Sequence, residues 1–126
     1  MLTQYSLKTE TAQKMRRLCG AYIRGLRIDA GLTQAQVAKA LNYQYYTMIS
    51  QVETGKARIP PEDYAKWASI LGVDLRELAK TILFYMDPFT HHALFGGDHP
   101  LVAVERDALR HKRNDGATDD AGLPSA

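Results

Sequence analysis

The side chains best suited to binding chemistry lie between Gln34 and Arg58, where amides, hydroxyls and cations recur at helical spacing. An amide can make two hydrogen bonds to an adenine edge, a hydroxyl can reach a phosphate, and a cation neutralises phosphate charge. Side chains of these types are suited to contact with a nucleic acid. The candidate DNA-binding residues are Gln34, Tyr46, Thr47, Ser50, Gln51, Lys56 and Arg58.

This stretch is predicted to form two short helices. The residues on the outward face of the second helix are the predicted base-reading positions. Gln51 would read adenine through its amide, and Thr47 would touch a thymine methyl group or a phosphate. Tyr46 could reach a phosphate through its hydroxyl or lie against a sugar. The neighbouring Tyr43 and Tyr45 could instead be partly buried in the core, and the sequence leaves both interpretations open.

No arrangement of residues typical of catalysis or of metal binding is present in the sequence. There is no P-loop, no Rossmann fingerprint, no nucleophile elbow and no pair of carboxylates in an apolar setting. His91 and His92 are adjacent, so on a helix they point about 100° apart and cannot easily share a metal. Cys19 is the single cysteine, which excludes an internal disulfide and fits a small buried side chain in a reducing cytoplasm. We therefore expect no enzymatic activity, no cofactor, no metal and a cytoplasmic location.

Two short helices joined by a tight corner, between Thr33 and Gly55, must position the candidate residues. Thr33 is a good N-cap, and Gln36 three positions later completes the spacing of a capping box. Asn42 stands where a left-handed residue should end the first helix, and Gly55 stands where the second should end.

Three further helices are predicted around this pair, because two short helices cannot bury their own apolar faces. They run from about Thr11 to Ala30, from Pro61 to Leu71, and from Leu75 to about Met86. Gly20 and Gly25 weaken the first of them by about 1 kcal/mol each, and a break near Gly20 is possible. The apolar periodicity assigns to the core Met15, Leu18, Tyr22, Ile23, Leu26, Val37, Ala38, Leu41, Ile49, Val52, Ala65, Ala68, Ile70, Leu71, Leu75, Leu78, Ile82 and Leu83.

The motif GLTQ…VA…L…ISQVE.GK is specific, because residue types and spacing agree over several predicted helices at once. The residues concerned are Tyr22-Ile23-Arg24, Leu26-Arg27, Gly31-Leu32-Thr33-Gln34, Val37-Ala38, Leu41, Ile49-Ser50-Gln51-Val52-Glu53, Gly55-Lys56 and Leu71-Gly72-Val73. With them, about half of the chain resembles the phage-repressor (Cro-like, xenobiotic-response-element type) helix-turn-helix DNA-binding family. Between Leu41 and Ile49 this sequence has one residue more than the family usually has, and it lacks the usual Ser or Thr N-cap.

The resemblance implies an all-α fold, which is a compact five-helix helix-turn-helix domain of the phage-repressor type with a short helical C-terminal extension. It implies that Gln34 and the loop residues Lys56 and Arg58 contact phosphates. It also implies that Arg27 and Glu53 form a structural salt bridge that orients the second short helix. The alternative for Gln34, Lys56 and Arg58 is that they are ordinary solvent-exposed side chains that contact no phosphate.

The implied function is that of a sequence-specific DNA-binding transcriptional regulator, a repressor. It would insert the helix around Tyr46–Thr54 into the major groove of double-stranded DNA as a homodimer. The alternative is an antitoxin-like or other protein-interaction module, in which a protein partner binds the C-terminal extension and DNA binding is secondary.

Charge is unevenly distributed along the 126 residues, although the formal net charge is only +2. Residues 1–60 hold nine basic and three acidic side chains, whereas residues 61–126 hold seven basic and eleven acidic ones. A basic half that contains the two short helices is what a DNA-binding face requires. The longest apolar run, Thr81–Met86, is far shorter than the ~20 residues of a membrane span, so no membrane association is expected.

The predicted parts of the chain are a flexible arm (1–10), the helix-turn-helix domain (11–86), a helical extension (87–113) and a disordered tail (114–126). The extension opens with a short helix, Phe89–Phe95. The apolar segment Ile82–Phe95 is the candidate dimerisation surface, because aromatic residues and Met are enriched at interfaces. It could equally cover the first helix as part of the core.

Overall fold

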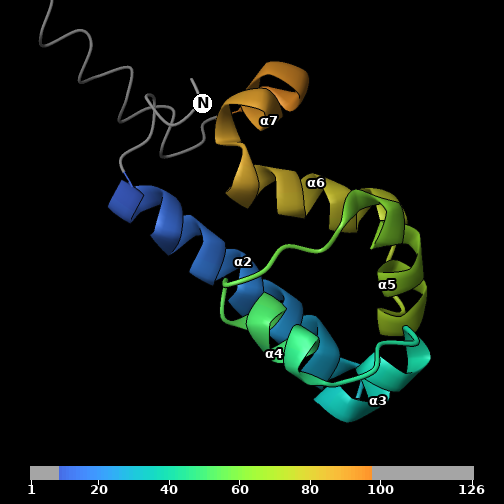
Figure 1. Ribbon diagram of the computed structural model, residues 1–126. Coiled ribbons are helices and arrows are strands. Elements are labelled where there is room, and N and C mark those ends of the chain that lie inside the picture. The colour runs from blue at the N-terminus through green and yellow to red at the C-terminus, as the bar shows by residue number, and fades with distance from the viewer. Residues whose placement is uncertain (1–8, 98–126) are drawn as a thin grey trace, which may run out of the picture. The chain divides into compact units, whose positions relative to one another are not determined.

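The computed structural model describes residues 9–97, and in this part of the chain every regular element is helical (Figure 1). The elements, in order, are α2 (Thr9–Asp29), α3 (Gln34–Ala40), α4 (Thr47–Glu53), η1 (Pro61–Asp63), α5 (Tyr64–Leu71), α6 (Leu75–Met86) and α7 (Pro88–Phe95). The predicted all-α class is thus confirmed for the described residues. None of these helices is both long enough and apolar enough to cross a membrane.

The chain divides into two compact units, Met1–Asp87 and Pro88–Ala126. The first unit contains α2 to α6, and the described part of the second contains α7. α2 begins at Thr9 rather than at Thr11. The rest of the predicted arm, the extension after Gly97 and the predicted tail lie outside the described residues.

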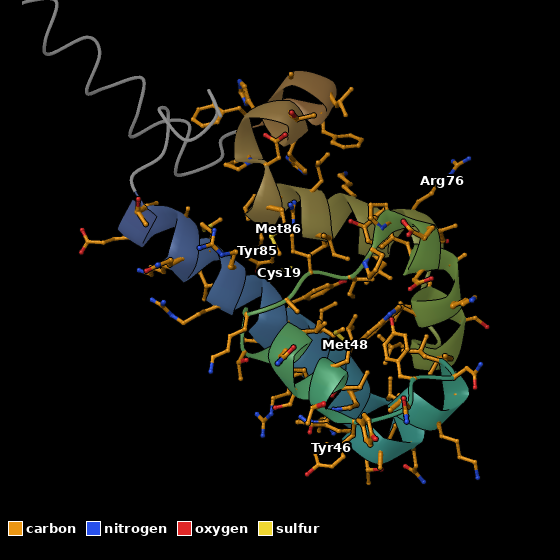
Figure 2. The ribbon with its side chains drawn as sticks, in the orientation of Figure 1. Cys19, Tyr46, Met48, Arg76, Tyr85 and Met86 are labelled. Carbon is orange, nitrogen blue, oxygen red and sulfur yellow. The ribbon has the colours of Figure 1, made fainter. Side chains whose placement is uncertain are left out.

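α2 is the longest helix, and α4 and α6 both pack against it (Figure 1). α5 packs against α6, and α3 packs against α4. Cys19 of α2 lies on the side toward Tyr85 and Met86 of α6 (Figure 2). The buried core consists of Cys19, Ile23, Val37, Ala38, Leu41, Ile49, Val52, Ile59, Trp67, Ala68, Leu71, Leu78 and Ile82.

Three of the predicted core residues are exposed instead. Leu18 is 42% exposed and Leu75 is 45% exposed, and Ala65 also faces solvent. On α2 the buried line passes through Cys19 and Ile23, and Leu18 lies about 100° to one side of Cys19. Leu75 shares a helical face with the buried Leu78 and Ile82, as predicted. It is exposed because it is the first residue of α6, before the part of the helix that packs on the core.

The largest fully buried side chain belongs to Trp67, which the periodicity did not select. The prediction started an α-helix at Pro61, whereas Pro61–Asp63 forms a 3-10 turn and α5 begins at Tyr64. Trp67 lies four residues before Leu71 and therefore on the same buried face of α5, whereas Ala65 lies about 160° around the helix from Trp67.

The first part of the predicted dimerisation surface belongs to the core of the first unit. Ile82 is buried, and Tyr85 and Met86 pack against the core. The Tyr85 ring lies 6.4 Å from the ring of Tyr22 on α2, measured between centroids. For Ile82, which is buried, the alternative of packing on the first helix describes its position. Tyr85 and Met86 are only partly buried, and a part for them in a dimer stays a prediction.

α7 is one residue longer than predicted, because it starts at Pro88 rather than at Phe89. Within this unit the rings of His91 and Phe95 lie 5.0 Å apart between centroids, and His92 Nδ1 lies 2.9 Å from the carbonyl oxygen of Gly97. Leu94 and Phe95 are both more than half exposed. The second unit therefore presents two large apolar side chains to solvent.

Candidate nucleic-acid interface

Local hydrogen bonds define both ends of α3 and so the angle at which α4 follows. The Thr33 hydroxyl accepts from Gln36 N at 3.1 Å, and Gln36 Oε1 accepts from Thr33 N at 2.8 Å, which confirms the predicted capping box. Asn42 follows α3 with φ 64°, in the left-handed region. The next backbone N–H, of Tyr43, donates back to the Ala38 carbonyl at 2.9 Å. This hydrogen-bond pattern is a Schellman motif, which ends the helix and turns the chain sharply.

Tyr43 attaches the corner to the start of the next helical segment. Its hydroxyl donates to Asp63 Oδ2 at 3.3 Å, and burial raises the pKa of the Tyr43 phenol. Tyr45 is 66% exposed, and its hydroxyl accepts from Gln44 Nε2 at 3.2 Å. Of the two tyrosines that the sequence left open, Tyr43 is therefore partly core and Tyr45 is on the surface.

Two glycines allow α4 and the loop after it to lie directly on the backbone of α2. A Cβ at Gly20 would lie 2.4 Å from the Glu53 carbonyl oxygen and 2.7 Å from that of Val52. A Cβ at Gly55 (φ 82°) would lie 2.9 Å from the backbone oxygen of Arg16. α2 runs unbroken through Gly20, so this glycine serves packing and does not interrupt the helix.

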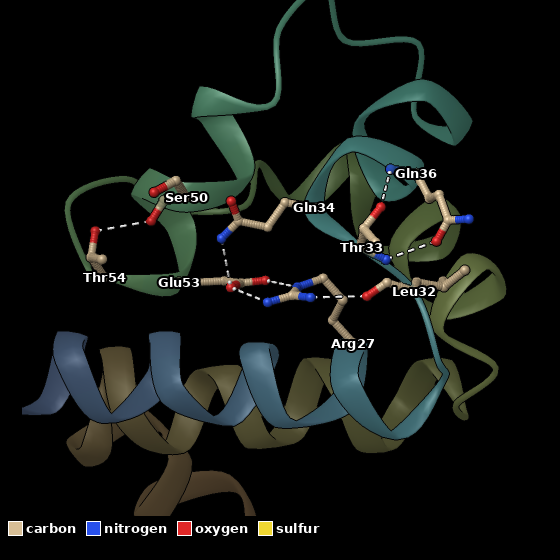
Figure 3. A network of polar contacts seen from close by, with 8 residues as sticks. All are labelled: Arg27, Leu32, Thr33, Gln34, Gln36, Ser50, Glu53 and Thr54. Carbon is tan, nitrogen blue, oxygen red and sulfur yellow. Dashed lines mark hydrogen bonds and ion pairs between the residues drawn. The ribbon is translucent and has the colours of Figure 1, made fainter.

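A buried carboxylate, Glu53, is the centre of the polar network in Figure 3. Arg27 Nε donates to Glu53 Oε2 at 2.6 Å, and Arg27 Nη2 donates to Oε1 at 3.0 Å. Arg27 Nη1 donates to the Leu32 carbonyl at 2.9 Å. The two side chains are only 12% and 3% exposed. The hydrogen bonds to Glu53 raise the pKa of Arg27, and the pair fixes α4 to the end of α2.

Gln34 belongs to the same network. Its Nε2 donates to Glu53 Oε1 at 3.0 Å (Figure 3). A side-chain amide nitrogen carries two N–H groups, so one is used by Glu53 and the other can reach a further acceptor. The first turn of α3 and the last turn of α4 are thereby held together through one carboxylate.

α4 divides into a buried face and an exposed face. Ile49 and Val52, the predicted inward pair, are buried. On the other side Thr47 and Gln51 are exposed and Ser50 is half-buried. The helix starts at Thr47, just after the predicted start between Gln44 and Tyr46. The polar side chains chosen from the sequence as base readers therefore lie together on the solvent side.

Tyr46 precedes α4 and lies at the corner between α3 and α4 (Figure 2). Tyr46 is 56% exposed and makes no side-chain capping hydrogen bond to α4. An open groove of about 360 Å³ borders it, lined by Ala35, Ala38, Lys39, Asn42, Tyr43, Gln44, Tyr45 and Tyr46. An amphipathic phenol in this position can pack on a sugar while its hydroxyl reaches a phosphate.

Lys56 and Arg58 are both exposed in the loop after α4. The backbone N–H of Lys56 donates to the Gln51 carbonyl at 2.8 Å, so this residue is fixed beside α4. Burial raises the pKa of Cys19 to about 11, and the charge of Arg58 opposes this rise. Burial also raises the pKa of Tyr64, which Arg58 again opposes. The charge of Arg58 is thus felt by Cys19 of α2 and Tyr64 of α5, whereas the backbone of Lys56 is bonded to α4.

Within residues 9–97 no group of three or more His, Cys, Asp or Glu side chains lies close enough together to hold a metal ion.

Sequence reasoning missed two residues: Gly20, which lets α4 pack on α2, and Trp67, the largest fully buried side chain. A single glycine inside a helical pattern is a signal of close packing, but nothing local indicates what packs there.

Comparison with known protein families identifies a domain that covers half of the chain. The profile of a family described as "Helix-turn-helix domain" matches residues 18–80, which is half of the chain. The matched range begins in α2, contains all of α3, α4 and α5, and ends in α6. No curated protein and no solved structure matches the chain.

Proposed function

The chain belongs to the helix-turn-helix domain family, and on that premise we propose that it is a sequence-specific DNA-binding transcriptional regulator of the phage-repressor (Cro-like, xenobiotic-response-element) type. The observation that carries the proposal is the division of α4 into a buried apolar face and an exposed polar face, with its last turn fixed by Glu53. A short helix held in this way offers the same side chains to a DNA groove without reorganisation.

In the proposed complex α4 enters the major groove of double-stranded DNA. Gln51 hydrogen-bonds the edge of an adenine, and Thr47 contacts a thymine methyl group or a phosphate. Gln34 already has one N–H bound by Glu53, and its other N–H donates to a phosphate. Lys56 neutralises a second phosphate from the loop, without reading sequence.

Tyr46, Ser50 and Arg58 complete the proposed contact surface. The Tyr46 phenol lies against the sugar–phosphate backbone at the start of α4, and Ser50 borders the base-reading positions. Arg58 contributes its positive charge from the exposed loop after α4.

Binding-site selection from random duplexes tests the proposal. The parent protein should enrich one sequence, and Gln51→Ala should relax preference at one or two positions and cost about 1–3 kcal/mol of specific binding. Ser69→Ala is the matched control, because Ser69 is an exposed polar residue on α5, away from α4. Failure of the parent to enrich any sequence would refute the function, and an unchanged preference in Gln51→Ala would remove Gln51 from the readers.

We also propose that the regulator acts as a homodimeric repressor, because one recognition helix reads few base pairs and specific affinity commonly needs two half-sites. The exposed Leu94 and Phe95 of α7 are the proposed dimer contacts. Sedimentation of the full chain should show a dimer that Leu94→Asp with Phe95→Asp converts to a monomer, whereas Ala93→Asp should not. A parent that is monomeric at high concentration would contradict this and favour the antitoxin-like alternative, with a protein partner at α7.

A further inference from the structure

Two exposed arginines, Arg17 and Arg24, lie on one side of α2 and have no role in the contacts described above. They are seven residues apart, so they share a helical face and are separated by about 10 Å along the axis. Within residues 9–97 neither of them forms an ion pair with a carboxylate. Their charge is therefore available to an anionic partner.

The position of this side of α2 relative to α4 follows from three contacts. The backbone at Arg16 and Arg17 meets Gly55, Gly20 meets the Glu53 carbonyl, and Arg27 binds the Glu53 carboxylate. On the helical wheel Arg16, Gly20 and Arg27 fall within about 40° of one another, and they define the line of α2 that α4 covers. Arg24 and Arg17 lie about 60° and 80° beyond that line, away from the buried residues Cys19 and Ile23. They border α4 on its solvent side.

The loop after α4 connects these arginines to the proposed DNA contacts. Gly55 lies on the α2 backbone at Arg16 and Arg17, where its Cβ would be 2.9 Å from Arg17 N. The next residue, Lys56, is therefore carried across α2 close to Arg17. A duplex bears one phosphate charge per about 1.7 Å of its axis, so an arginine pair about 10 Å apart faces several phosphates.

We propose that Arg17 and Arg24 form, together with Lys56, a basic edge that binds the phosphates of the DNA backbone alongside α4. This proposal rests on the proposed function, because it is the docking of α4 that brings a duplex to this edge. It assigns α2 a direct part in DNA contact in addition to its part in the core. The edge supplies affinity and no sequence preference.

The test is a salt series with Arg17→Gln, Arg24→Gln on the enriched operator and on a random duplex. Each lost phosphate contact reduces the slope of log affinity against log salt by about 0.9, so the double variant should be shallower by about 1.8 on both duplexes. Raising salt threefold should then cost the parent about sevenfold more affinity than the variant. The preferred sequence should not change, and the variant should keep its helical circular dichroism.

The matched control is Lys66→Gln, Arg76→Gln, which removes the same charge from exposed positions on α5 and α6. Figure 2 shows Arg76 far from Tyr46 and Met48. The control should keep the parental slope. A parental slope in the arginine variant, or an equal loss in the control, would overturn the basic edge and leave the proposed function intact. Absence of any DNA binding by the parent protein would overturn both.

Discussion

Replacing Gly20 by alanine adds one methyl group where α4 touches α2, and we expect the exchange to destabilise the domain. The new Cβ would lie 2.4 Å from the Glu53 carbonyl oxygen and 2.7 Å from that of Val52. Non-bonded atoms favour separations of about 3.5 Å, so α4 would have to move by roughly 1 Å. These neighbours are backbone atoms, which no change of rotamer can move aside. Overpacking of this kind costs about 1–3 kcal/mol.

Gly25→Ala is the matched control on the same helix, because no atom lies within 4 Å of a Cβ at that position. Both exchanges gain the same helix propensity of about 1 kcal/mol, so the difference between the two variants measures the contact alone. Gly25→Ala should be more stable than the parent. Gly20→Ala should be less stable than Gly25→Ala by about 1–3 kcal/mol, or roughly 5–20 °C in melting temperature for a domain of this size.

Thermal and urea unfolding followed by circular dichroism measure both variants. A titration of the enriched operator then measures what the movement of α4 does to binding. Because Glu53 also binds Arg27 and Gln34, Gly20→Ala should weaken specific binding even at temperatures where the protein remains folded. Equal stabilisation by the two alanines would refute the direct contact between α2 and α4.

Three other predictions follow from single contacts. Arg27→Ala should cost about 3–5 kcal/mol in urea unfolding, because it leaves Glu53 buried without its partner; a cost below about 1 kcal/mol would show that the carboxylate regains water. Asn42→Ala should lower the free energy of unfolding by about 1–2 kcal/mol, because residue 42 has a left-handed backbone conformation. Asn42→Gly should not, because glycine adopts that conformation readily. Equal effects of the two exchanges would contradict the left-handed conformation. The free energy of unfolding should fall between pH 9 and 11, because the Cys19 thiol ionises near its ordinary pKa of 9.0 in the unfolded chain but only at about 11 in the folded one. The fall attributable to this group is at most about 3 kcal/mol, and Cys19→Ala should lack that part of the pH dependence.

The features that the sequence predicted correctly depend on residues close together in the chain. The capping box of Thr33 and Gln36 spans one helical turn, and the left-handed position of Asn42 depends on its own side chain and its place after α3. The inward pair Ile49 and Val52 follows from spacing within α4. Each of these is decided by covalent neighbours, so a local pattern is enough to find it.

The features that were mispredicted or missed depend on parts of the chain that are distant in sequence. Gly20 matters because of Glu53, which is 33 positions further along. The burial of Trp67 depends on the packing of α5 against other helices, among them α6. The burial of Ile82 and the packing of Tyr85 depend on contacts with α2, which is distant in sequence. None of these contacts can be read from periodicity.

Under the proposed function, the two faces of α4 have a consequence for how the preferred DNA sequence can change. Ile49, Val52 and Glu53 carry the attachment to the rest of the domain, whereas Thr47 and Gln51 carry none of it. Exchanges at exposed positions away from such contacts typically alter stability by less than about 0.5 kcal/mol. A library varied only at these two outward positions should therefore yield folded proteins with altered operator preferences. The outward residues of α4 could therefore be exchanged without compensating changes in the buried residues that attach the helix to the domain.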